Sequence, residues 1–170
     1  FSNESGSLSI DVQSAKQNLT DSVNNGYTEI ISAYNALYTV LIVNLDPFFD
    51  NDLGISPKLT FTVSSQQKQI VTYDTSYAEK TIDQHLDEEA QYSRVRAQIA
   101  LGIIKGAIAD GKESANTVFQ NLSKAEGALE NTQIFLIILS DAVTNSGLDD
   151  TTLATYKATL DTARGSITTA

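Results

Sequence analysis

The N-terminal part of the chain carries an apolar stripe that leaves it little choice of fold. Between Val12 and Leu41 the apolar residues recur at steps of three or four, which places them on one face of a long α-helix. They are Val12, Ala15, Leu19, Val23, Tyr27, Ile30, Tyr34, Leu37 and Leu41. Such a helix is about 50 Å long, and Pro47 ends it because the residue before a proline is disfavoured in the α region. Residues 1–10 are rich in Ser and Gly and are expected to form a loose lead-in.

Start and stop signals divide the rest of the chain into three further helices. Ser76 and Glu79 form a capping box that begins a helix ending near Gly111. Another helix is predicted over about 112–143, and the short break between the two makes them antiparallel neighbours. Asp149 or Asp150 caps the last helix. The main apolar positions of these helices are Ile82, Leu86, Ile99, Ile103, Val118, Phe119, Leu122, Leu129, Leu136, Val143, Leu153, Tyr156, Leu160 and Ala163.

Residues 58–63 are ambiguous because Leu59, Phe61 and Val63 alternate with polar residues, as in a strand. The segment either forms a short helix with Pro57 at its first position or crosses the bundle in an extended form, and the conformation of residues 58–73 stays open. Long helices with short joints predict an all-α fold. We expect an antiparallel up-and-down bundle of four main helices plus this one short segment, forming a single domain over residues 1–170.

The composition limits where such a bundle works and what it binds. The chain contains no Cys, Met or Trp and begins at Phe1, so we expect that a signal peptide has been removed and that the mature protein is secreted. Its net charge of −10 disfavours binding to nucleic acids and to anionic membranes. The sequence has no run of about 20 apolar residues and predicts no transmembrane segment. It leaves the oligomeric state undetermined.

The chain is poor in the side chains that perform catalysis. His85 is its single histidine, and it has no nucleophile elbow, phosphate-binding loop or dinucleotide motif. We therefore predict a protein that is not an enzyme and that needs no cofactor. Asp83, Asp87 and Glu89 lie near His85 on the predicted helix, but a di-iron bundle needs a histidine on each of two helices. This cluster is interpreted as an exposed polar face, and no metal site is predicted.

Three acceptor sequences for N-linked glycosylation begin at Asn3, Asn18 and Asn121. About two would arise by chance in a chain this rich in Asn, Ser and Thr, so they give no independent support for secretion. In a eukaryotic secreted protein, Asn18 and Asn121 are the stronger candidates because they lie within predicted structure.

Two features exceed what a plain bundle requires. The runs Tyr38–Val43 and Ile134–Leu139 are apolar around most of their helices. They either pack together at one end of the bundle, under the last helix and Phe48-Phe49, or line a pocket for an apolar ligand. Gly102 and Gly106 form a smooth strip that accepts a bulky neighbour such as Phe119 or Tyr34, or a ligand. The predicted ligand-binding residues are Tyr38, Leu41, Ile42, Gly102, Gly106, Phe135 and Ile138.

These patterns predict a secreted, non-enzymatic helical bundle that binds or carries an apolar small molecule or lipid. Two alternatives remain open. One is an extracellular structural or host-interaction glycoprotein with a filled core. The other is a membrane-active helical toxin in which the apolar residues 99–109 insert into a bilayer.

Overall fold

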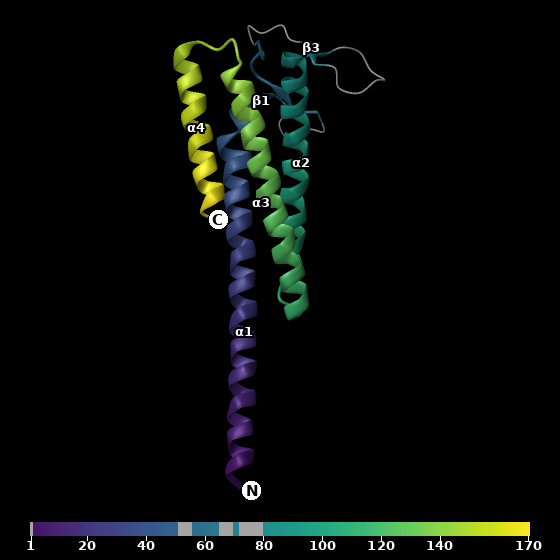
Figure 1. Ribbon diagram of the computed structural model, residues 1–170, viewed down its shortest axis with the longest axis vertical. Coiled ribbons are helices and arrows are strands. Elements are labelled where there is room, and N and C mark those ends of the chain that lie inside the picture. Colours follow the sequence, from purple (N-terminus) through teal and green to yellow (C-terminus); the bar gives the residue numbers. More distant parts are fainter. Residues whose placement is uncertain (1, 51–55, 65–69, 72–79) are drawn as a thin grey trace.

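The protein is an all-α antiparallel bundle, as predicted. The computed structural model describes residues 2–50, 56–64, 70–71 and 80–170. Four long helices run alternately up and down (Figure 1). They are α1 (Ser2–Tyr38), α2 (Ile82–Asp110), α3 (Ala115–Thr144) and α4 (Asp150–Thr168). The short elements are the π-helix η1 (Thr39–Asn44), the 3₁₀-helix η2 (Asp46–Phe48), and the two-residue strands β1 (Phe49–Asp50), β2 (Lys58–Leu59), β3 (Ile70–Val71) and β4 (Lys80–Thr81).

Residues 58–63, which we call the strap, cross one end of the bundle without forming a helix, with a strand at Lys58–Leu59 and a bend at Thr60–Phe61. β2 pairs antiparallel with β1, with Phe49 opposite Leu59, and β3 pairs with β4. At the far end of the strap, Val63 forms an isolated bridge with Ser146 in the turn between α3 and α4. The short-helix alternative for this segment is therefore wrong, and the chain crosses the bundle end through a short strand, a bend and a bridge. Its partners are short pieces of chain at the bundle end, which carry too little strand pattern to be recognised in the sequence. The capping box predicted at 76–79 lies outside the described residues.

The loose lead-in predicted over residues 1–10 is wrong, because α1 is helical from Ser2. Its first half projects beyond the turn between α2 and α3 (Figure 1). Residues 10–22 are all exposed, and the stripe positions Val12 and Leu19 are 51% and 54% accessible. The α2–α3 end of the bundle reaches α1 only near Asn24, whose side-chain oxygen accepts a hydrogen bond from Lys112 Nζ at 2.7 Å.

From Gly26 onward the stripe of α1 is buried against α3. Ile30, Leu37 and Leu41 are fully enclosed in the core. Gly26 marks a close approach of α1 to α3, since a Cβ placed there would stand 3.0 Å from Leu122 Cδ1 and 3.0 Å from Val118 Cγ1. Glycine lowers the helix propensity at this position, but the absence of a side chain lets α1 pack closely against α3.

Arg94 ties three elements together in the core. Its side chain is 0% exposed, and its guanidinium carbon lies 5.5 Å from the ring centre of Phe49 and 6.0 Å from that of Phe135. The two rings are themselves 6.0 Å apart. This group joins β1, α2 and α3, and it holds the start of the connection that leads into the strap.

Asp149 caps α4, one of the two positions predicted for this role. Its carboxylate accepts hydrogen bonds from the backbone N–H groups of Thr151 and Thr152, at 3.1 and 3.0 Å, and from the Thr152 hydroxyl at 2.7 Å. These donors hold the pKa of Asp149 below its ordinary value, and the Thr152 hydroxyl makes the largest contribution.

Replacing Gly26 with valine is expected to lower the free energy of unfolding by about 1–3 kcal/mol, because the new side chain overpacks against α3. Gly106→Val is the matched control, since no heavy atom of the described residues lies within 4 Å of a Cβ placed there. We expect this control to unfold at the wild-type urea concentration or above it. Urea unfolding followed by circular dichroism measures both, and equal stabilities would contradict the close α1–α3 contact.

The cap on α4 predicts a pH dependence of stability. Because the pKa of Asp149 is lowered on folding, its carboxylate stabilises the fold fully above the unfolded-state pKa, and this contribution is lost as the pH falls through the lower folded-state value. Asn also caps helices well, so Asp149→Asn should lose less stability than the wild type on acidification below about pH 4. Urea midpoints from about pH 6 to about pH 2 test this. Parallel declines in the two proteins would refute it.

Candidate functional site

A groove of about 370 Å³ lies between α1 and α2. Its walls come from the C-terminal end of α1 with η1, and from the second half of α2. The lining residues are Tyr34, Tyr38, Ile42, Gln98, Leu101, Gly102 and Lys105. We call this hollow the α1–α2 groove. Its volume is near the lower end of the range of about 300–1,000 Å³ that is typical of small-molecule sites.

Local chain geometry explains why this groove is open. Tyr34 and Tyr38 stand one turn apart, with ring centres 6.1 Å from each other, and form an aromatic wall. Ile42 follows from the π-helical turn η1, and π-helical turns occur frequently at functional sites. On the opposite side Gly102 offers no side chain, and no heavy atom of the described residues lies within 4 Å of where its Cβ would stand.

Lys105 is the only charged residue among those that line the α1–α2 groove. Within the described part of the chain it makes neither an ion pair nor a hydrogen bond through its side chain. The groove therefore combines aromatic and aliphatic walls with one uncompensated cation at its edge. This arrangement suits an apolar body that carries an acidic group.

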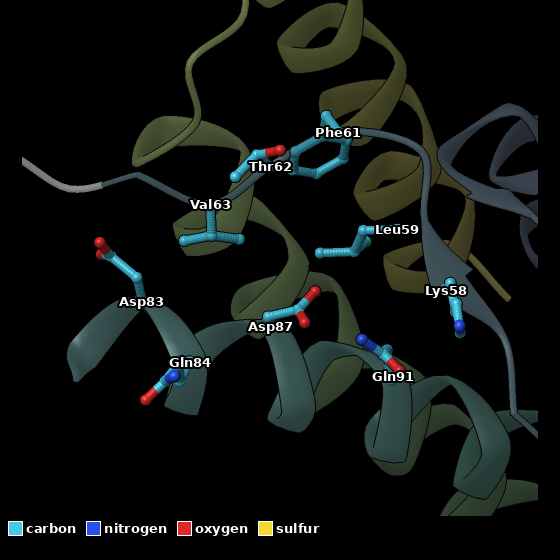
Figure 2. A pocket seen from close by; sticks show the side chains of 9 residues that line it. All are labelled: Lys58, Leu59, Phe61, Thr62, Val63, Asp83, Gln84, Asp87 and Gln91. Atoms are coloured by element: carbon cyan, nitrogen blue, oxygen red, sulfur yellow. The ribbon is translucent and has the colours of Figure 1, made fainter. Parts of the chain in front are cut away.

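A second hollow, of about 440 Å³, lies between the strap and the first turns of α2 (Figure 2). We call it the strap pocket. One wall is the strap itself, with Lys58, Leu59, Phe61, Thr62 and Val63, and the other is Asp83, Gln84, Asp87 and Gln91 of α2. The strap wall is held in place from behind, because the Phe61 ring packs edge-on against Tyr156 of α4 at 5.8 Å. Thr62 further accepts a backbone hydrogen bond from Gly147 at 3.2 Å.

The predicted ligand-binding residues separate into three groups. Tyr38, Ile42 and Gly102 come together in the α1–α2 groove. Leu41 and Phe135 are 0% exposed in the core, and Ile138 packs against that core from its edge, so these three fill space instead of opening a pocket. Gly106 lies on an exposed face of α2 without close neighbours among the described residues. Among the residues that the structure describes, no neighbouring helix packs onto the strip formed by the two glycines.

Sequence reasoning missed the polar members of both hollows. Gln84, Gln91, Gln98 and Lys105 recur every seven residues along α2, and each of them lines one hollow or the other. A seven-residue repeat places side chains on one helix face. This polar repeat, running beside the apolar stripe of α2, is the signal that could have located the α2 walls.

The predicted glycosylation sites differ in accessibility. Asn18 is exposed on α1, and Asn3 lies in the first turns of that helix. Asn121 is only 1% exposed, with its amide nitrogen donating to the Ala107 carbonyl at 3.2 Å and its side-chain oxygen accepting from Lys124 Nζ at 2.8 Å. A sugar on that nitrogen would displace the α2–α3 contact, so the folded protein presents Asn18 and not Asn121 as an acceptor.

Other candidate chemistry finds no support in the described part of the chain. There, no group of three or more His, Asp and Glu side chains is placed to hold a metal ion. Within the same residues, no helix has the length and apolarity needed to cross a bilayer. Comparison with protein-family models, curated proteins and solved structures gives no match.

The burial of Asn121 can be separated from its place in an acceptor sequence. Asn121→Gln and Ser123→Ala both destroy that sequence, but Ser123 is exposed. Asn121→Gln is expected to lower the free energy of unfolding by about 1–3 kcal/mol, because a buried polar contact is broken. Ser123→Ala should change it by less than about 0.5 kcal/mol. Urea unfolding compares the two, and similar stabilities would show that the Asn121 contacts do not hold α2 to α3.

Proposed function

We propose that this protein is a non-enzymatic bundle that binds an apolar small molecule in the α1–α2 groove. The observation that carries this proposal is an open hollow with aromatic and aliphatic walls beside a core of buried apolar side chains. Small-molecule sites are typically concave and mostly apolar, with a few polar groups that orient the ligand. The groove fits that description.

Lys105 defines the polar end of the preferred ligand. An ammonium group without a protein counter-ion is satisfied by water in the free groove and by an acidic group in the complex. An ion pair at such a half-open site adds a modest amount, about 1 kcal/mol or less, to the apolar contacts. The proposed ligand class is therefore an acidic amphiphile with a compact aliphatic or aromatic body. Tyr34, Tyr38 and Ile42 would contact the body, and Lys105 would contact the acid.

We further propose that the protein acts as a carrier outside the cell. The support is physical: a net charge of −10 favours solubility. A filled-core interaction protein remains the competing function. It requires no bound small molecule, so the binding experiment below decides between the two.

Decanoate is a suitable probe, and decanol is its uncharged analogue. Isothermal titration calorimetry measures the binding of both. Gly102→Leu is expected to weaken decanoate binding about tenfold or more, because the new side chain occupies the groove. Gly106→Leu, one turn further along α2 and outside the groove, is the matched control and should bind as the wild type does. Lys105→Gln should weaken the binding of decanoate several-fold while leaving that of decanol unchanged.

These variants also define failure. If the wild type binds neither decanoate nor decanol, or if Gly102→Leu binds decanoate as tightly as Gly106→Leu does, the α1–α2 groove is not a ligand site. If only the Lys105→Gln result differs from expectation, the groove still binds an apolar ligand, but the proposal that the ligand carries an acidic group is wrong.

A further inference from the structure

The strap pocket has two chemically different walls that face each other (Figure 2). Leu59, Phe61 and Val63 of the strap line this pocket and present an apolar surface to it. Opposite them, α2 presents Asp87 with Gln91 one turn further along. In the close-up the Asp87 carboxylate extends from α2 toward the strap, and the Leu59 side chain lies above it.

The charge of Asp87 is not compensated within the described part of the chain. Its carboxylate makes no ion pair or hydrogen bond with the residues described there, and its side chain is half-buried. Asp87 lies in the second turn of α2, beyond the first-turn N–H groups where a helix favours a negative charge. Lys58, at the β2 end of the pocket, extends away from Asp87 in the close-up. A carboxylate thus faces apolar side chains across a hollow of about 440 Å³.

From these walls we propose that the strap pocket is a second binding site, which takes an organic cation with an apolar body. An alkyl- or arylammonium ion would place its charge against Asp87 and its body against Leu59 and Val63. The amide oxygen of Gln91 would accept a hydrogen bond from one of the remaining N–H groups. The single carboxylate of Asp87 matches a monocation.

This site is separate from the α1–α2 groove and does not depend on the function proposed there. The two hollows use different stretches of α2, residues 83–91 and residues 98–105. Arg94 stands between those stretches and is enclosed by Phe49 and Phe135. The charges are opposite, because the groove offers an ammonium group and the pocket offers a carboxylate.

The test measures the binding of decylammonium, with decanol as the uncharged control. Calorimetry gives the affinity, and backbone amide NMR shifts locate the site. Asp87→Asn is expected to weaken the binding of decylammonium about tenfold and to leave that of decanol unchanged. Asp110→Asn removes an exposed carboxylate at the other end of α2 and is the matched control for the general acidity of the protein. It should bind decylammonium as the wild type does. Asp87→Glu keeps the charge and should retain most of the binding.

Shifts on addition of decylammonium are expected in the strap and in the first turns of α2, and not around Gly102. Gly102→Leu should leave decylammonium binding intact, so failure of the groove and failure of the strap pocket are distinguishable. The proposal is overturned if the wild type does not bind decylammonium. It is also overturned if Asp87→Asn and Asp110→Asn weaken binding equally, since the attraction would then be non-specific. If Asp87→Asn does not fold, unaltered binding by Leu59→Ala overturns it instead.

Discussion

The enclosure of Arg94 by Phe49 and Phe135 is the contact that anchors the strap and the pocket beneath it. It fixes the position of β1 against α2 and α3, and β1 in turn holds the strap through its pairing with β2. A guanidinium group is weakly hydrated for a cation and packs well on aromatic faces, which makes arginine the basic residue best suited to such a position. Without this anchor the strap would lose one of its two fixed ends. Along α2, Arg94 lies between the two hollows. The strap pocket lies toward the N-terminal end of the helix, and the α1–α2 groove lies toward its C-terminal end.

Much of the fold followed from periodicity, because a helix that packs must bury one face. Ile30, Leu37 and Leu41 are buried as the stripe of α1 predicted, and Asp149 caps α4. The exposure of Val12 and Leu19 could not be predicted, because the stripe continues unchanged past the level where the α2–α3 turn ends. Periodicity tells which face of a helix is apolar. It does not tell how far along the axis a partner extends.

The candidate site was only partly predictable for a related reason. Apolar runs such as Tyr38–Val43 signal burial on several sides, but they do not distinguish a filled core from a lined cavity. Leu41 proved to fill the core, while Tyr38 and Ile42 line the groove beside it. The glycines show the same difficulty. Gly26 interrupts the helix pattern but provides a close contact with α3, whereas Gly102 and Gly106, which resemble a contact strip, have no close neighbours among the described residues.

The net charge of the protein affects ligand binding at the two proposed sites in opposite ways. A net charge of −10 attracts cations over a distance of about a Debye length, roughly 8 Å at physiological salt, and repels anions over the same distance. The carboxylate of Asp87 therefore acts together with the overall field, and a cationic ligand needs little further stabilisation to reach it. Lys105 acts against that field. An anionic ligand in the α1–α2 groove must draw most of its affinity from apolar contact with the tyrosine wall and Ile42. Lys105 then determines the orientation of the bound ligand more than its affinity.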